Sequence, residues 1–522
     1  MRTEFDYIIV GAGSAGCVLA SRLSQDPNVR VALVEAGGTD DAPEINMPVA
    51  FPQLFKTKYD WDFASEPEPG LRNRRIYLPR GKTLGGSSAI NAMIYIRGNA
   101  ADFDGWADED APGWSYQEML PYFIRSERNE RGDPRYHGHS GPLAVQDSRS
   151  MHPLVDHLLE AAAKSGYRSN DDFNGASQMG LGRFQLTQRN GVRWSTASAY
   201  LHPACERVNL QVFTDSLVLR LLLQKGRASG LSIHRQGREE TLFCEGEIIL
   251  AAGAYGSPQI LMLSGIGPTD ELARFGVPVV VDLPVGINLQ DHPLLPMSYL
   301  TDERSLFGAG SPEDVSLYQE GRGPLTSNVA EGGVFLSTRG DDSVPDCQFE
   351  MAPAMFFDEG LSAPVNHALT MATTILKPTS RGRVALRSAR PDAKPRIYHN
   401  YLATDDDRAT MIASVRLAMD VFAQPSLSKV RRAPFSVPAS DAEADIVGFI
   451  EQRTGTNYHP TSTCAIGRVV DSDLRVFDTE GLRVADASVM PSIVRGNTNA
   501  AVIAIAEKAA DILLSNVPTE AR

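Results

Sequence analysis

The sequence has little cysteine and no long apolar run, and each shortage excludes a class of protein. Five cysteines are spread over 522 residues, odd in number and never in a CxxC pair. This spacing favours neither a disulfide framework nor a zinc site, so we expect free, buried thiols and no bound metal. No segment approaches the ~18 uninterrupted apolar residues that a membrane-spanning helix requires.

Positive charge is also in short supply. The chain has 50 lysine and arginine residues against 64 aspartate and glutamate residues, which gives a net charge of −14. Nucleic acid requires a clustered basic surface, so we expect no nucleic-acid partner. A strand-like segment starts about five residues into the chain and leaves no room for a secretory signal, which predicts a cytoplasmic protein. Peripheral contact with the inner face of the membrane and homo-oligomer formation both stay open.

A βαβ unit near the start is the clearest feature that is present. Residues 5–10 have the pattern of a buried strand, 15–24 that of a helix and 29–34 that of a second buried strand. Between the first strand and the helix lies Gly11-Ala-Gly-Ser-Ala-Gly16, a GxGxxG turn. Such glycines permit a tight turn, let the backbone approach a pyrophosphate and let helix and strand pack closely, while the helix N-terminus favours phosphate charge. The turn therefore predicts a dinucleotide site formed by Gly11, Gly13, Ser14, Ala15 and Gly16.

An acidic residue completes this dinucleotide pattern. Glu35 ends the second strand about 20 residues after the turn and is followed by Ala36. A carboxylate at this place accepts hydrogen bonds from ribose hydroxyls and disfavours the 2′-phosphate of NADP. The turn and Glu35 alone do not separate FAD from NAD.

Four blocks of sequence carry a resemblance to one enzyme family. The first is the βαβ turn with Glu35. The others are Gly81-Lys-Thr-Leu-Gly-Gly-Ser-Ser-Ala-Ile-Asn91, Gly253-Ala-Tyr-Gly-Ser-Pro-Gln-Ile-Leu-Met-Leu-Ser-Gly-Ile-Gly267, and a C-terminal group of Tyr458-His-Pro-Thr-Ser-Thr-Cys464, residues 484–491 and Gly496-Asn-Thr-Asn-Ala500. Together they resemble the glucose–methanol–choline (GMC) flavoprotein oxidoreductases, especially the choline-dehydrogenase-like branch that includes bacterial alcohol dehydrogenases.

The resemblance implies FAD as the cofactor. Besides the turn, Glu35 and Ala36, it assigns cofactor contacts to Gly86, Ser87, Asn91, Ala92, Met93, Ile94, Val218, Asp486, Ala487 and Asn499. Some relatives attach FAD covalently through a histidine in the second block, where this chain has Ile90. A side chain without a nucleophilic nitrogen predicts non-covalent FAD. The third block is expected to shape a strand-to-helix turn near the cofactor rather than to act in catalysis.

The resemblance also shapes the predicted fold. Alternating segments at 344–351, 368–376 and 382–386 predict a mostly antiparallel sheet, with helices near 405–423 and 440–453. We expect an α/β protein, α+β overall, with a discontinuous Rossmann-like FAD-binding domain and an inserted substrate domain built on that sheet and flanked by helices. The predicted limits are 1–155, 195–298 and 455–522 for the FAD-binding domain, and 156–194 and 299–454 for the substrate-binding domain.

A histidine and an asparagine form the predicted catalytic pair. Imidazole is suited to proton transfer near neutral pH, and the family places its catalytic base at the position of His459. Asn497 occupies the second family position, where an amide can hydrogen-bond the substrate oxygen. The expected reaction is oxidation of a primary alcohol to the aldehyde, with the hydroxyl proton taken by His459 and hydride passing to flavin N5. Oxygen or a quinone would be the electron acceptor.

The substrate is less well defined by the sequence. Residues 325–333 resemble a segment near the substrate pocket, in which Glu331 would face a cationic substrate. Trp61, Phe356 and Phe357 would supply aromatic faces, and Phe356 and Phe357 have the alternative of belonging to the core. An apolar pocket favours a primary alcohol of medium or long chain. A choline dehydrogenase or oxidase, a cyanohydrin-lyase-like flavoprotein without redox turnover and a NAD-dependent dehydrogenase stay open as alternatives.

Overall fold

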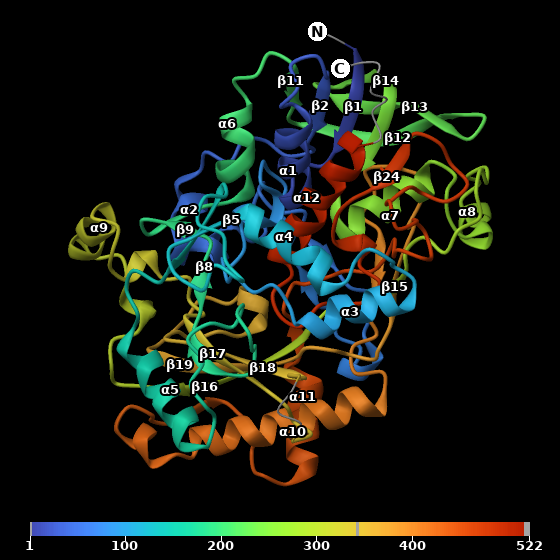
Figure 1. Cartoon of the computed structure of the whole chain (residues 1–522). Helices are drawn as coiled ribbons and strands as arrows, with labels where there is room; N and C mark the ends of the chain where they lie inside the picture. Colours follow the sequence, from blue (N-terminus) through green and yellow to red (C-terminus); the bar gives the residue numbers. More distant parts are fainter. Residues whose placement is uncertain (1–2, 341–343, 516–522) are drawn as a thin grey trace.

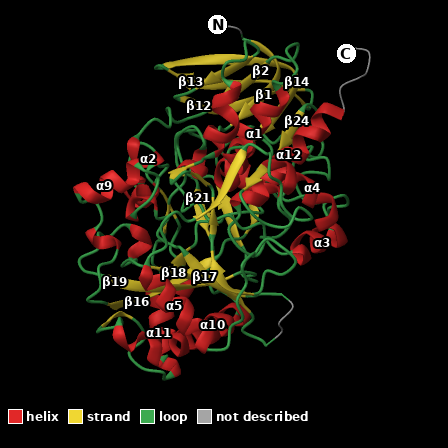
Figure 2. Cartoon of the chain, turned by 60° about the vertical axis from the view of Figure 1, so that its left-hand side comes forward, coloured by secondary structure: helices red, strands yellow, loops and turns green. Residues whose placement is uncertain are grey.

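Two seven-stranded sheets form the framework of the protein (Figure 1). The structure is a computed structural model and describes residues 3–340 and 344–515, so the outermost limits of the predicted FAD-binding domain lie outside the described residues. One sheet lies near the two chain ends and the other at the opposite end of the molecule, with helices packed against both (Figures 1 and 2). The predicted α/β class, with a second, mostly antiparallel sheet, is confirmed.

The first sheet collects strands that are far apart in the sequence. Its order is β11-β2-β1-β14-β13-β12, with β24 beside β14. The parallel strands β1 and β2 are short apolar runs that are buried along most or all of their length, as expected for strands covered on both faces. Their bounds are β1 (Glu4–Val10), β2 (Val31–Val34), β11 (Leu210–Phe213), β12 (Ser216–Gln224), β13 (Arg227–Arg235), β14 (Arg238–Leu250) and β24 (Leu482–Val484). The segment 210–223 is divided between β11 and β12 at residues 214–215.

Two helices from opposite ends of the chain lie side by side on this sheet. They are α1 (Ser14–Leu23) and α12 (Asn499–Ser515), blue and red in Figure 1. Arg22 of α1 pairs with the buried Glu507 of α12 at 2.8 Å. At their first residues, the Ser14 hydroxyl donates to Asn499 Oδ1 at 2.6 Å. The C-terminal motifs are thereby brought to the GxGxxG turn.

The second sheet is antiparallel and is covered by helices on its outer face. Its order is β22-β16-β19-β18-β17-β7, with β23 beside β16. Helices α5, α10 and α11 lie against it (Figures 1 and 2). The bounds are β7 (Gly180–Arg183), β16 (Pro293–Leu300), β17 (Gly332–Leu336), β18 (Cys347–Ala352), β19 (Ala368–Ile375), β22 (Pro434–Ser436), β23 (Gly455–Thr456), α5 (Pro153–Lys164), α10 (Asp405–Phe422) and α11 (Glu443–Arg453).

This sheet crosses the predicted domain limits at 298 and 455. Strand β16 pairs with β19 along its whole length, and its first residues pair with β23, so both belong to the antiparallel sheet. Strand β20 (Gly382–Ala385) does not join that sheet, because it pairs instead with β15 (Ile287–Leu289) and β21 (Arg396–Tyr398). Alternation marks such segments as strands but does not identify their partners.

Shorter elements connect the two sheets. The stretch 36–80 contains a short helix, two short strands and 3₁₀ turns. The remaining helices and strands are α2 (Pro43–Asn46), β3 (Phe63–Ala64), β4 (Tyr77–Leu78), α3 (Ala100–Glu109), α4 (Tyr116–Ser126), β5 (Glu127–Asn129), β6 (Leu143–Asp147), β8 (Gln185–Leu186), β9 (Gln188–Arg189), β10 (Val192–Arg193), α6 (His202–Ala204), α7 (Gly253–Leu263), α8 (Thr269–Arg274) and α9 (Pro312–Gln319).

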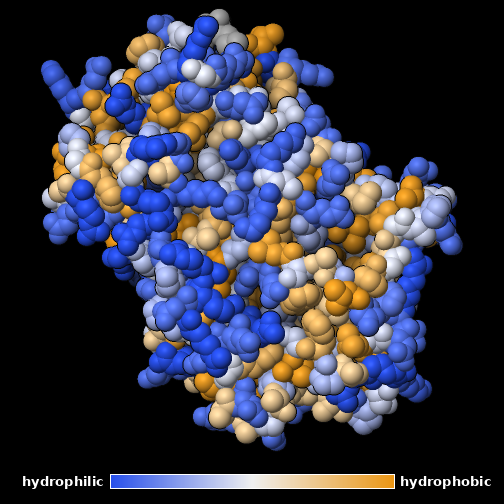
Figure 3. All heavy atoms as spheres, turned by 180° about the vertical axis from the view of Figure 1, so that it is seen from behind, coloured by the Kyte–Doolittle hydropathy of each residue, from blue (hydrophilic) through white to orange (hydrophobic). Residues whose placement is uncertain are grey.

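The prediction of free, buried thiols is confirmed for four of the five cysteines. All five cysteines are free, and four are buried, but Cys205 is exposed because it follows the short helix α6 at the surface. Hydrophilic residues alternate with apolar ones over the face shown in Figure 3. Within 3–340 and 344–515, no helix has the length and apolar character needed to cross a membrane.

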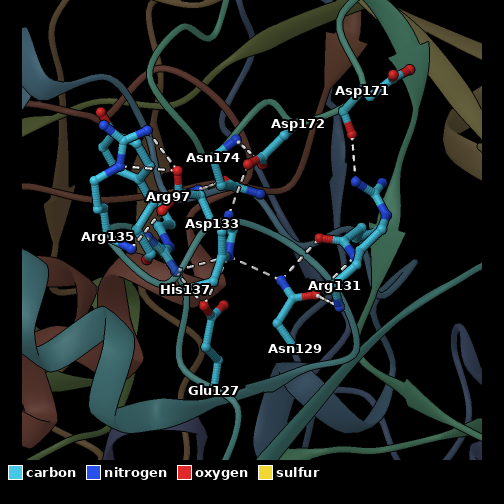
Figure 4. A network of polar contacts seen from close by, with 12 residues as sticks. Arg97, Glu127, Asn129, Arg131, Asp133, Arg135, His137, Asp171, Asp172 and Asn174 are labelled. Atoms are coloured by element: carbon cyan, nitrogen blue, oxygen red, sulfur yellow. Dashed lines mark hydrogen bonds and ion pairs between the residues drawn. The ribbon is translucent and has the colours of Figure 1, made fainter.

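A buried network of charges lies between β5 and the loops around it (Figure 4). The His137 ring contacts Glu127 through Nδ1 and Asp172 through Nε2, both at 2.9 Å. Arg97 reaches the same Glu127 at 2.6 Å. Burial lowers the pKa of His137, but the hydrogen bonds to Asp172 and Glu127 outweigh burial, so the pKa is raised. The surroundings of the ring therefore favour its charged form, and the ring joins three segments.

Replacing His137 with glutamine is expected to lower the stability by about 3–5 kcal/mol, the usual cost of breaking a buried ion pair. Because its folded pKa is raised, the histidine contributes fully below the ordinary value of about 6.5 and loses this contribution as pH rises through the folded pKa. The Tm difference between the native protein and His137→Gln should thus be largest below about pH 6.5 and should narrow as the pH rises through the raised pKa of His137. His234→Gln, an exposed histidine on β13, is the control. A Tm difference that does not change with pH would contradict a charged His137.

Candidate active site

A cavity of about 340 Å³ is lined by residues of both sheets and of the loops between them. It collects nearly all the predicted site residues, although they come from five separate parts of the chain. Those that line it are Gly11, Gly13, Ser14, Ala15, Glu35, Ala36, Gly86, Ser87, Asn91, Ala92, Met93, Ile94, Val218, His459, Asp486, Ala487, Asn497 and Asn499. Gly16, by contrast, does not line the cavity.

The glycines of the first turn have different structural tasks. A Cβ on Gly16 would lie 1.8 Å from the Gly11 carbonyl oxygen, so this glycine permits α1 to pack on the turn. Gly11 has φ +99°, and a Cβ there would lie 2.6 Å from the Ala251 carbonyl oxygen. At Gly13 the nearest heavy atoms to a Cβ would be 4.0 Å away, and the residue lines the cavity. Only at Gly13 does the missing side chain leave room for a ligand.

The second glycine block closes against the first. Gly86 has φ +51°, and a Cβ there would lie 2.6 Å from Cα of Gly13. Backbone therefore meets backbone at this side of the cavity. Asn91 follows, and its Oδ1 accepts hydrogen bonds from Arg193 at 2.8 Å and from the Met93 amide at 3.0 Å. These contacts fix the segment 91–94 along the cavity wall.

Two buried carboxylates hold the turns around the cavity. Glu35 accepts hydrogen bonds from the amides of Ala12 and Gly37, each at 2.8 Å. Burial raises its pKa to about 7 against the effect of these bonds. Asp486 accepts from the amides of Gly253 and Ser488, each at 2.8 Å, and caps the start of α7. Both carboxylates reach the cavity wall.

The site fits a dinucleotide by its own geometry. Helix α1 begins at the cavity with no side-chain cap on its first amides, which leaves N–H groups and the positive end of the helix for a pyrophosphate. Gly13 and Gly86 leave that region free of side-chain bulk. Glu35 lies beyond the turn, where ribose hydroxyls would be expected.

The predicted catalytic pair, His459 and Asn497, comes together in the lining of the same cavity. Asn497 Nδ2 lies 3.3 Å from His459 Nε2. Asn497 Oδ1 is buried and has no hydrogen-bond partner among the described residues. Burial lowers the pKa of His459 well below its ordinary value, and the neighbouring His292 and Arg80 add to this effect. The imidazole is therefore neutral at pH 7 and able to accept a proton.

Three residues of this region were not predicted from the sequence. His292 Nδ1 lies 3.0 Å from His459 Nδ1. The Asp291 carboxylate accepts hydrogen bonds from the His459 amide at 2.7 Å and the His292 amide at 2.9 Å. Glu350 lines the cavity and accepts from Asn457 at 2.9 Å. Asp291-His292-Pro293 directly before an apolar strand was an available signal, whereas Glu350 lies in an ordinary alternating segment.

Two of the predicted substrate contacts do not reach the cavity. The Glu331 carboxylate accepts from the Ser327 hydroxyl and from the His152 amide at 2.7 Å, and thus holds its own loop in place. Phe357 packs on Phe435, with ring centroids 5.3 Å apart. Phe356 and Trp61 do line the cavity, and neither is a fully buried core residue.

This combination defines a dinucleotide-dependent enzyme, since the nucleotide turn and a neutral histidine face one cavity. Two family models described as GMC oxidoreductase match residues 5–294 and 378–506. Mitochondrial choline dehydrogenase of Mus musculus is 42% identical over 536 residues, covering 98% of this chain and 90% of that protein. The alcohol dehydrogenase (acceptor) of Pseudomonas putida is 41% identical over 530 residues, covering 98% and 96%. The chain belongs to the GMC oxidoreductase family.

Solved structures agree with this membership. Pyridoxine 4-oxidase from Mesorbium loti superposes with a TM-score of 0.90 at 32% identity, covering 97% of this chain and 98% of that one. A formate oxidase variant from Aspergillus oryzae superposes with a TM-score of 0.92 at 28% identity, covering 98% of each chain. The architecture is thus shared along nearly the whole chain.

Proposed function

We propose that this protein is an FAD-dependent oxidoreductase that oxidises a primary alcohol to the aldehyde. The observation that carries the proposal is that the dinucleotide turn and the neutral His459 with Asn497 line one and the same cavity. Similarity to an alcohol dehydrogenase and to a choline dehydrogenase over 98% of the chain supports it. The partners are a small-molecule alcohol and an electron acceptor.

The protein's own contribution is proton transfer and orientation. His459 Nε2 takes the hydroxyl proton, which raises electron density at the carbinol carbon. Asn497 lies beside Nε2 and holds the substrate oxygen as negative charge develops on it. FAD, when bound, supplies the oxidant that accepts hydride from that carbon.

The cofactor is proposed to bind without a covalent link. Ile90 lines the cavity at the position where some relatives carry an attaching histidine, and an alkyl side chain cannot form that bond. Denaturation with trichloroacetic acid should therefore release FAD into the supernatant. Flavin that stays in the protein pellet would contradict this assignment.

The cavity wall favours an apolar alcohol. Aromatic rings of Phe51, Phe55, Trp61, Phe356 and Tyr458 line it, which suits an alkyl chain of medium or long length. An alcohol that carries a quaternary ammonium group is the second candidate. Glu350 favours it, since a buried carboxylate beside aromatic faces is a recognised way to hold such a cation.

Anaerobic titration of the purified yellow protein tests these alternatives. We expect 1-octanol to bleach the flavin absorbance, and choline to do so weakly. Bleaching by choline but not by 1-octanol would assign the second candidate, an alcohol with a quaternary ammonium group, as the substrate. No bleaching by any alcohol would overturn alcohol oxidation and favour a lyase-type flavoprotein. Admitting air afterwards identifies the acceptor, because rapid peroxide formation marks an oxidase and dye reduction without peroxide marks a dehydrogenase.

A further inference from the structure

Two imidazole rings are in direct contact beside the cavity. The rings of His292 and His459 meet edge to face, with centroids 5.2 Å apart and planes at 85°. We propose that His292 is a positioning residue that holds His459 in the tautomer with its proton on Nδ1, so that the Nε2 lone pair faces Asn497 and the substrate hydroxyl. The effect of this tautomer on catalysis rests on the proposed function, whereas the assignment of the tautomer does not.

The proton on His292 is fixed by a backbone carbonyl. Its Nε2 lies 3.0 Å from the Leu376 carbonyl oxygen, which can only accept, so Nε2 carries a hydrogen. The His292 side chain belongs to a fully buried residue, and burial lowers its pKa to about 4. A neutral imidazole carries one proton. Nδ1 of His292 is consequently an acceptor.

That acceptor determines the tautomer of the second ring. His459 Nδ1 lies 3.0 Å from His292 Nδ1, and two lone pairs facing each other would repel, so His459 must donate from Nδ1. Because His459 is also neutral, its Nε2 carries a lone pair. The chain of donors runs from His459 through His292 to the Leu376 carbonyl.

The orientation of Asn497 agrees with this assignment. A lone pair on His459 Nε2 needs a donor, and Asn497 Nδ2 faces it at 3.3 Å. The amide oxygen is then turned away from the ring and has no partner among residues 3–340 and 344–515. The opposite tautomer would favour a flipped amide, with Oδ1 toward the ring.

Backbone pairing holds the two rings at this separation. The first residue of β16, Pro293, pairs with Thr456 of β23, so the segment directly after His292 and the segment just before His459 run side by side. The Asn457 amide donates to the His292 carbonyl at 2.8 Å. Asp291 accepts from both histidine amides. A contact between residues so distant in sequence is thereby made rigid.

The charged groups around His292 and His459 do not raise the pKa of either ring enough to protonate it. Asp291 and Asp102 raise the pKa of His292, whereas Lys377, which pairs with Asp102 at 3.2 Å, lowers it. Arg80 lies near His459 and lowers its pKa. Burial exceeds the effect of the two carboxylates, so both rings stay neutral over the working pH range.

The test combines a tautomer measurement with two variants at position 292. In protein labelled with ¹⁵N-histidine, the His459 signals, identified by their loss in His459→Gln, should show a protonated Nδ1 and a bare Nε2. His292→Phe should give a mixture of tautomers and reduce kcat by about 100-fold with KM within about threefold, since loss of the tautomer-setting partner in a hydrolase triad costs up to ~10⁴-fold. His292→Asn keeps an acceptor oxygen and should regain at least about tenfold of that loss.

The outcomes separate this inference from the proposed function. A His459 protonated on Nε2 in the native protein overturns the inference whatever the activity. Unchanged kcat in His292→Phe, or a reduced kcat with an unchanged tautomer, also overturns it. A native Nδ1–H tautomer together with full activity in His459→Gln supports the tautomer assignment and refutes His459 as the base.

Discussion

Replacing His459 with glutamine is expected to leave a folded, yellow protein whose rate of flavin reduction by an alcohol falls about a thousandfold. General-base catalysis contributes about 10²–10⁴-fold, and glutamine has no group that accepts a proton near neutral pH. Its amide is close to imidazole in size and polarity, so the cavity wall stays filled. Stopped-flow measurement of anaerobic bleaching reports this step without interference from the reoxidation that follows.

The same variant tests how the rate of flavin reduction depends on pH. Because the pKa of His459 is lowered well below its ordinary value, the ring stays neutral and basic as the pH falls through about 6.5. The native rate should therefore persist into mildly acidic buffer, and an acid limb that belongs to His459 should be absent from His459→Gln. His234→Gln, which changes an exposed histidine on β13, is the matched control and should behave as the native protein does. The assignment would be refuted by a His459→Gln variant that keeps the native rate of flavin reduction, or by a loss of that rate in His234→Gln as large as in His459→Gln.

Local patterns in the sequence were sufficient for the cofactor side of the cavity. The GxGxxG turn lies within one βαβ unit, and the close approach of Gly16 to the Gly11 carbonyl oxygen is a contact within the turn itself. Glu35 follows from the same unit, because its place is set by the end of β2. His459 and Asn497 were predicted through motifs, and the pairing of α1 with α12 explains how Asn497, two residues before α12, comes near the turn.

The polar support of the histidine could not be found in this way. Asp291 and His292 meet His459 only because β16 pairs with β23 and β19, and strand pairing between distant segments is not encoded in any local pattern. Glu331 shows the opposite case, a residue that a motif predicts at the cavity but whose side chain does not line it. Its motif lies near the cavity, but the direction of one side chain depends on the Ser327 hydroxyl and the His152 amide, which come from the loop conformation and from the start of α5.

Two alanine variants of the first turn should separate cofactor binding from folding. At Gly16 the new Cβ would lie 1.8 Å from a backbone oxygen, and neither backbone segment can move without displacing α1 from β1. We therefore expect Gly16→Ala to lose FAD and also to lower the Tm of the apoprotein by many degrees. Overpacking of this kind usually costs about 1–3 kcal/mol, and more where backbone must shift.

At Gly13 the consequence is different. The nearest heavy atoms to an added Cβ are 4.0 Å away, so Gly13→Ala should fold with the apoprotein Tm of the native chain. Its methyl group would project into the space expected for the pyrophosphate, and we expect the Kd for FAD to rise at least tenfold, measured by quenching of flavin fluorescence in reconstituted apoprotein. Gly105→Ala, where nothing lies within 4 Å of the new Cβ, controls for the substitution itself. Unchanged FAD affinity in Gly13→Ala would mean that the pyrophosphate does not lie against this turn.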